Sequence, residues 1–170
     1  MLQKLFLAVV MVCAFAASAC ADDFDLGLRF SHMVDTNVEG NGYEVAFRYF
    51  PPLPVKVLSL GASVGENRME YDKGTYTKKV ETFPLGVFAN LHLPSLFIKP
   101  YAGFGALIYN SHDIRSPNPS DTDSERNSTT TWQCGADISL PVPKASLNIE
   151  LRRLVDDHAT MAFGGFWLKF

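Results

Sequence analysis

The chain has 170 residues, of which 47% are hydrophobic, 12% aromatic and 19% charged. This length suits one domain and hardly two, and the composition excludes collagen-like, disordered and coiled-coil chains. The formal net charge of −3 offers no basic surface for nucleic acid, so no nucleic-acid partner is expected.

The N-terminal segment has the three zones of a secretory signal. Lys4 precedes an apolar run of about 15 residues, whereas a helix that crosses a bilayer needs roughly 20. Small residues follow at positions 17–21. We therefore expect residues 1–21 to be removed on export and residues 22–170 to form one domain.

Two cleavage patterns compete at the end of this segment. Ala19-Cys20-Ala21 is an A-x-A site, whereas Ser18-Ala19-Cys20 resembles a lipoprotein box that would acylate Cys20. Ala17 stands where such a box usually has leucine, which favours ordinary cleavage. Ordinary cleavage would leave Cys134 without a partner for an internal disulfide.

From Phe24 onward, apolar residues recur with a period of two, which is the period of a strand with unlike faces. No helical stripe competes with this pattern. The predicted strands are 24–31, 43–50, 55–65, 83–92, 101–109, 132–140, 147–152 and 162–170. An even number of alternating strands indicates an all-β, antiparallel, up-and-down barrel.

The connections between these strands alternate in length. Segments 51–54, 93–96 and 141–144 are tight and rich in proline, whereas 32–41, 66–79 and 111–128 are long and polar. Asp72-Lys73-Gly74-Thr75 reads as a hairpin tip. We therefore expect the third and fourth strands to continue as a projecting two-stranded ribbon.

Alternation alone leaves open whether the apolar face fills a soluble barrel or contacts lipid. The polar set is rich in Gly and Ser, which suits a crowded lumen better than a surface in water. Aromatic residues gather at predicted strand ends, as in the girdles of outer-membrane barrels: Tyr43, Tyr49, Phe50, Phe97, Tyr101, Tyr109, Trp132 and Phe170. These features favour a transmembrane barrel with an apolar outer face.

Two segments resemble a known family. Gly164-Gly165-Phe166-Trp167-Leu168-Lys169-Phe170 looks like the signal that the barrel assembly machinery recognises, with Phe166, Leu168 and Phe170 as its alternating apolar residues. Lys99-Pro100-Tyr101-Ala102-Gly103-Phe104-Gly105 is similar to the fifth strand of small barrels of the OmpA, OmpX and opacity-protein type. The resemblance implies a monomer in the outer membrane of a Gram-negative bacterium, with lipid and lipopolysaccharide around it and both termini in the periplasm.

The inward face of such a barrel would hold four acids and four bases: Asp25, Arg29, Glu44, Arg48, Asp137, Glu150, Arg152 and Lys169. If the first two strands pair symmetrically about residues 36 and 37, Arg29 faces Glu44 and Asp25 faces Arg48. Balanced pairs in a narrow lumen favour a plug. A narrow conduit for small or apolar solutes is the alternative.

Other candidate sites are weaker. His32, His112 and His158 lie near acidic residues in the long connections, but without metal-ligand spacing, so neither metal nor cofactor is expected. Residues 121–125 offer oxygens for calcium but lack the glycine and the length of a calcium loop. Cys134 falls on the apolar face, and nothing near it favours a thiolate.

Two further observations concern lipid chemistry. Arg153 is out of phase and reads as a rim charge or as a contact for lipopolysaccharide phosphates. Ser111-His112-Asp113 resembles a catalytic set only superficially, because adjacent strand residues point to opposite faces. The H-x-S-N motif of lipid A deacylases is absent, so we expect no enzyme, with lipid A modification as the alternative.

The expected function is therefore structural, combined with binding of a surface or host partner through the long connections. A soluble periplasmic ligand-binding barrel remains the alternative outside the membrane.

Overall fold

The structure is a computed structural model that describes residues 23–35, 38–53, 56–72, 77–94, 97–115 and 124–170. The segment 1–21, with both cleavage patterns and Cys20, lies outside these residues. In the described part, no helix is long and apolar enough to span a membrane.

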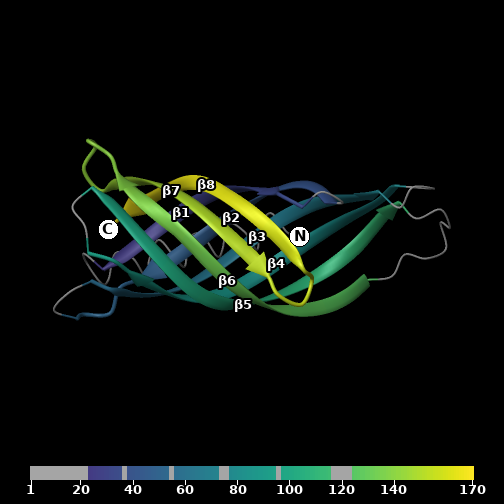
Figure 1. Cartoon of the computed structure of the whole chain (residues 1–170), viewed down its shortest axis with the longest axis horizontal. Helices are drawn as coiled ribbons and strands as arrows, with labels where there is room; N and C mark the ends of the chain where they lie inside the picture. Colours follow the sequence, from purple (N-terminus) through teal and green to yellow (C-terminus); the bar gives the residue numbers. More distant parts are fainter. Residues whose placement is uncertain (1–22, 36–37, 54–55, 73–76, 95–96, 116–123) are drawn as a thin grey trace.

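The described residues form eight strands that close into one barrel (Figure 1). Each strand pairs antiparallel with its neighbour in sequence, and β8 returns to pair with β1. The strands are β1 (Phe24–Met33), β2 (Val38–Tyr49), β3 (Leu58–Asp72), β4 (Thr77–His92), β5 (Ile98–Arg115), β6 (Ser124–Ser139), β7 (Ala145–Leu154) and β8 (Ala159–Lys169). The predicted eight-stranded, antiparallel, up-and-down barrel is confirmed.

The four middle strands are longer than predicted. β3, β4, β5 and β6 have 15, 16, 18 and 16 residues, whereas β1 and β7 have 10 each. They continue beyond β1, β7 and β8 at the right of Figure 1. We call this extension the projecting sheet and define it as residues 68–72, 77–81, 111–115 and 124–126.

The projecting sheet corrects two expectations. Segments 66–79 and 111–128 were predicted as long connections, yet most of their described residues belong to strands. The expected two-stranded ribbon is part of a wider sheet, because β2 pairs with residues 68–71 of β3 and because β5 and β6 continue beside β4. The sequence of these segments is rich in charged residues, so it shows no regular apolar alternation. Backbone pairing, which is independent of side-chain polarity, holds them together.

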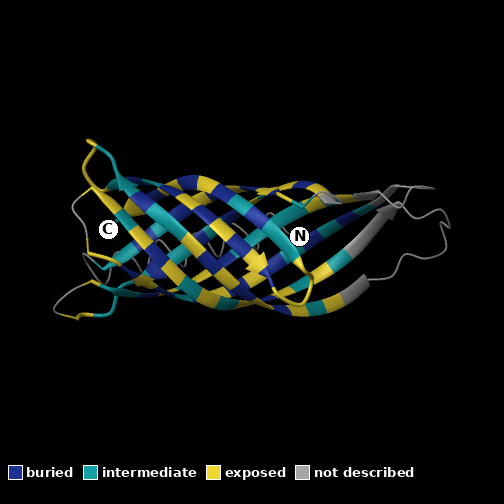
Figure 2. Cartoon of the chain, viewed as in Figure 1, coloured by how far each residue is buried: buried dark blue, intermediate teal, exposed yellow. Residues whose placement is uncertain are grey.

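The alternation of the two faces is regular along the closed part of the barrel (Figure 2). Leu28, Val87 and Phe166 point outward and are 47%, 60% and 51% exposed. Arg29 and Glu44 point inward and are buried. The large apolar residues therefore cover the outside of the barrel, and the charged residues lie inside.

Three of the predicted girdle aromatics lie elsewhere. Tyr101 is 5% exposed and points into the lumen, because it shares the inward phase of β5 with the buried Leu107. Phe50 packs on the guanidinium of Arg48 at the lumen mouth. Tyr109 donates a hydrogen bond of 2.7 Å to Asp157 in the β7–β8 turn. Tyr43, Phe97, Trp132 and Phe170 are exposed, as expected of interface residues.

Candidate functional site in the lumen

A ring of four buried charges crosses the middle of the lumen. Arg29, from β1, contacts Glu44 of β2 and lies 2.7 Å from Glu150 of β7. Arg152, also from β7, closes the ring with contacts of 3.1 Å to Glu44 and 2.7 Å to Glu150. Two acids and two bases therefore neutralise one another in a place from which water is largely excluded.

A second cluster lies nearer the tight turns. Arg48 Nη2 donates to Asp25 Oδ2 at 2.6 Å, and its Nη1 lies 2.7 Å from Asp137 Oδ2. One arginine from β2 thus engages carboxylates from β1 and β6. Two carboxylates around one guanidinium leave this cluster with one excess negative charge.

Tyr101 and Asn148 connect the two clusters. The Tyr101 hydroxyl donates a hydrogen bond of 2.7 Å to Glu150. Asn148 Nδ2 lies 2.9 Å from both Tyr101 Oη and Asp137 Oδ1. Charged and neutral groups therefore form one continuous hydrogen-bonded network.

Aromatic rings fill the space between the guanidinium groups. Trp167, which is 1% exposed, lies with its ring 4.2 Å from Arg48 Cζ and 5.4 Å from Arg29 Cζ. Phe163 lies 4.3 Å from Arg152 Cζ. Cation–π contacts of this kind favour the charged form of a desolvated arginine.

Glycines make room for these rings on the neighbouring strands. Gly27 lies directly opposite Trp167, and a Cβ at this position would come within 2.7 Å of the indole. Gly61 lies opposite Phe88, and a Cβ there would overlap the phenyl ring. Gly27 and Gly61, two of the glycines that indicate a crowded lumen in the sequence, therefore leave the space that aromatic rings occupy.

The sequence predicted part of this arrangement correctly. Both cross-strand contacts, Arg29 with Glu44 and Asp25 with Arg48, are present in the predicted register. Lys169, the fourth base of the predicted inward set, is half-buried and has no carboxylate within 4.0 Å among the described residues. Arg48 occupies the two nearby carboxylates instead.

The sequence reasoning missed an apolar cluster inside the barrel, toward the long connections. It contains Met33, Leu107, Leu154, Met161 and Phe163, all buried. The lumen is therefore not uniformly polar. Met161 and Phe163 have the same phase as Trp167 in β8, and this phase was the available signal.

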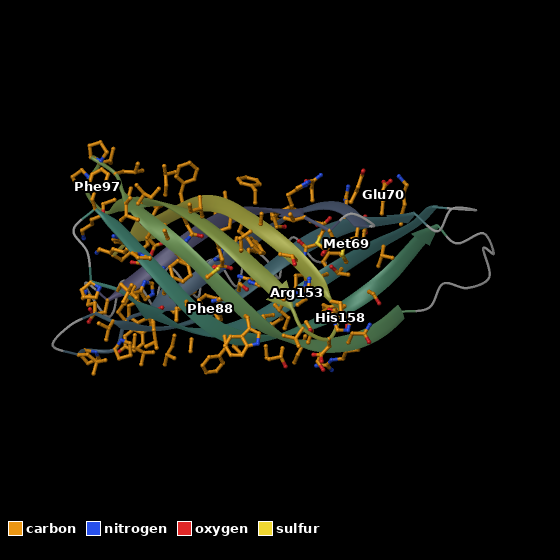
Figure 3. All side chains as sticks on the ribbon, viewed as in Figure 1. Met69, Glu70, Phe88, Phe97, Arg153 and His158 are labelled. Atoms are coloured by element: carbon orange, nitrogen blue, oxygen red, sulfur yellow. The ribbon has the colours of Figure 1, made fainter. Side chains whose placement is uncertain are left out.

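The rim candidates do not assemble into a metal site. His32 Nδ1 lies 2.8 Å from Asn41 Oδ1, and His158 lies in the β7–β8 turn (Figure 3). Among the described residues, no group of three or more His, Cys, Asp or Glu side chains could hold a metal ion. The side chain of His112 and residues 121–123 lie outside the described part.

Three other candidates are placed by the structure. Ser111, His112 and Asp113 are consecutive residues of β5, and their backbone lies opposite Thr82, Glu81 and Val80 of β4. Cys134 is exposed, on the outward phase of β6. Arg153 donates a hydrogen bond of 2.8 Å to Thr160 and lies 3.8 Å from Asp35.

Comparison with known proteins identifies the fold. No family model and no curated protein matches the sequence. Solved structures do match. Outer membrane protein OprG of Pseudomonas aeruginosa aligns with a TM-score of 0.59 and 10% identity, over 88% of this chain and 96% of that one. Neisserial surface protein A aligns with a TM-score of 0.58 and 13% identity, over 86% and 97%.

The attachment invasion locus protein Ail of Yersinia pestis aligns with a TM-score of 0.57 and 10% identity, over 89% of this chain and 100% of that one. Ail has also been solved with the heparin analogue sucrose octasulfate. The chain thus has the fold of small eight-stranded outer-membrane barrels, as the resemblance of its strands implied.

Proposed function

We propose that this protein is a monomeric barrel of a Gram-negative outer membrane, with lipid and lipopolysaccharide around it and its tight turns in the periplasm. The observation that carries the proposal is a belt of exposed apolar side chains to which every strand contributes: Leu28, Tyr43, Leu60, Val87, Phe104, Trp132, Ile149 and Phe166. Exposure of so large an apolar surface to water costs free energy, whereas contact of the same surface with lipid hydrocarbon does not. Export by cleavage after residue 21 belongs to the same proposal.

The last strand supports the proposed route of assembly. Phe166, Leu168 and Phe170 are exposed on the outer face of the barrel. They are therefore accessible to the barrel assembly machinery as an apolar alternating signal. Arg153 is exposed beyond the apolar belt, where its guanidinium could bind a lipopolysaccharide phosphate. Asp35, 3.8 Å away, neutralises part of its charge.

The proposal includes a closed lumen. The charged ring lies across the path through the barrel; it consists of Arg29, Glu44, Glu150 and Arg152. Trp167 packs on its side toward the tight turns, and the apolar cluster lies on its side toward the long connections. Opening a conduit would separate buried ion pairs, which is costly. A closed lumen is therefore favoured over a narrow conduit for small or apolar solutes.

We expect purified protein in a planar bilayer to give no steady, large single-channel conductance. The measurement is current at fixed voltage, with an open outer-membrane porin in the same bilayer as the control for sensitivity. A stable, large unitary conductance in most insertion events would contradict the closed lumen.

The proposed specific activity is binding of a surface partner through the projecting sheet. Its four segments contain five basic and five acidic residues, so charge balance gives no preference for a polyanion. Beyond Thr131, however, no strand in the described residues pairs with the free side of β6. The β7–β8 turn caps Thr130 through a hydrogen bond of 2.9 Å from Val155 N. Residues 124–128 therefore form an open strand edge that suits an extended peptide.

A pair of proline substitutions tests this edge. Successive residues of a strand direct their N–H groups to opposite neighbours, so one of Arg126 and Asn127 faces β5 and the other faces the open edge. We expect one of Arg126→Pro and Asn127→Pro to keep the stability of the wild type but to lose retention of displaying cells on immobilised matrix proteins. A variant without residues 69–78 should lose retention as well. Full retention by all three variants would contradict a role for the projecting sheet.

No catalytic activity forms part of the proposal. Ser111, His112 and Asp113 succeed one another along β5, which is a poor arrangement for a proton relay. An assay for release of acyl chains from lipopolysaccharide by the purified protein tests this point.

A further inference from the structure

A cavity of about 280 Å³ opens at the end of the lumen that carries the tight turns. Its lining includes four cationic side chains, Arg48, Lys56, Lys99 and Lys169, and two carboxylates, Asp25 and Asp137. The cations therefore outnumber the anions by two. Lys56 Nζ forms an ion pair of 2.7 Å with Asp23 Oδ1, and the Lys56 side chain is largely exposed.

The strand register gives each inner lysine a carboxylate opposite it. Lys169 of β8 faces Asp25 of β1, and Lys99 of β5 faces Asp137 of β6. Directly opposite charges on adjacent strands ordinarily pair. Neither pair is formed here, although both are within reach in the register.

Arg48 explains why both pairs are absent. Its guanidinium lies 2.6 Å from Asp25 and 2.7 Å from Asp137, and so takes both carboxylates. A planar guanidinium with several donors competes well against a single ammonium group for buried carboxylates. Among the described residues, Lys99 and Lys169 then have no carboxylate within 4.0 Å, and both line the same cavity.

The cavity is closed on its inner side. Trp167 packs 4.2 Å from Arg48 Cζ, and beyond it lies the ring of Arg29, Glu44 and their partners. His92, also in the lining, is held by Ser59 at 2.8 Å and lies between the rings of Phe50 and Tyr101. A solute that enters from the tight-turn end must leave by the same mouth.

We propose that this cavity is a binding site for a small divalent anion of the phosphate or dicarboxylate class, held between the ammonium groups of Lys99 and Lys169. Two half-buried, like charges that face one cavity repel each other, and a dianion between them removes this repulsion and gains charge-assisted hydrogen bonds. The volume holds a compact anion and excludes a polymer. This site is separate from the projecting sheet that is proposed to bind a surface partner. The proposal holds whether or not the barrel lies in a membrane.

Binding of radiolabelled inorganic phosphate to the folded barrel in detergent, by equilibrium dialysis at constant ionic strength, tests the site. We expect saturable binding of one phosphate per barrel. Succinate should displace this phosphate, whereas chloride at the same concentration should not. Lys99→Gln and Lys169→Gln should each weaken binding about tenfold or more, since each removes one charge-assisted contact. Lys169→Arg should retain most of the affinity, because it keeps the charge.

Lys144→Gln is the matched control, because it removes one positive charge at the same end of the barrel but outside the cavity lining. Heat-modifiable gel mobility verifies that each variant is folded. Equal weakening in Lys144→Gln would assign the effect to general surface charge and overturn the proposal. Absence of saturable binding of both phosphate and succinate to the wild-type barrel would also overturn it.

Discussion

Glu150→Ala is expected to destabilise the barrel by about 3–5 kcal/mol, which is the usual cost of removing one partner from a buried ion network. Glu150 accepts contacts from Arg29 at 2.7 Å, from Arg152 at 2.7 Å and from Tyr101 at 2.7 Å. Without this carboxylate, two buried guanidinium groups share Glu44 alone. The measurement is the free energy of unfolding in urea, with the barrel refolded into phospholipid vesicles.

The matched control is Glu70→Gln. Glu70 pairs with Lys79 in the projecting sheet, and its side chain is 48% exposed. Exposed pairs contribute about 0–1 kcal/mol, so this variant should unfold almost as the wild type does. If Glu150→Ala also stays within about 1 kcal/mol of the wild type, the ring does not stabilise the barrel in the manner described.

A double variant separates charge imbalance from lost packing. In Glu150→Gln with Arg152→Gln, one acid and one base are removed together, and the contact of Arg29 with Glu44 remains. We expect the double variant to be more stable than the single Glu150→Gln variant, because no buried charge is left in excess.

Val87→Arg is expected to cost about 2–4 kcal/mol if the outer face contacts hydrocarbon, which is the range for arginine near the middle of a bilayer. Val87 is 60% exposed and lies in the middle of the outward row of β4. On the surface of a soluble barrel, the same change would be nearly neutral, within about 0.5 kcal/mol. Unfolding in vesicles, together with cell fractionation of the wild type, measures the difference.

Val142→Arg provides the control for this substitution. Val142 is 61% exposed but lies in the β6–β7 turn, outside the strands. We expect this variant to unfold like the wild type. Equal tolerance of both arginines would favour the soluble periplasmic barrel and would contradict contact between β4 and lipid.

The sequence predicted contacts whose partners are adjacent in the chain. Arg29 and Glu44 lie on neighbouring strands with one connection between them, so alternation and symmetry sufficed to pair them. The reach of Arg29 to Glu150 spans 121 positions and depends on closure of the barrel. No local pattern specifies which charges meet across the lumen, because each strand determines only the face on which a side chain lies.

The period-two alternation by itself determined the number of strands and the separation of charged and apolar faces, because each strand expresses its own alternation locally. The even strand count and the alternating lengths of the connections then indicated the antiparallel, up-and-down order. Tertiary structure alone decided that Arg48 takes both carboxylates from the lysines opposite them, that Trp167 and Phe88 lie on glycines, and that β5 and β6 extend the projecting sheet. The physical reason is that these outcomes are competitions between groups far apart in the chain. Closure of the sheet brings such groups together, and geometry then selects among partners that the sequence leaves equivalent.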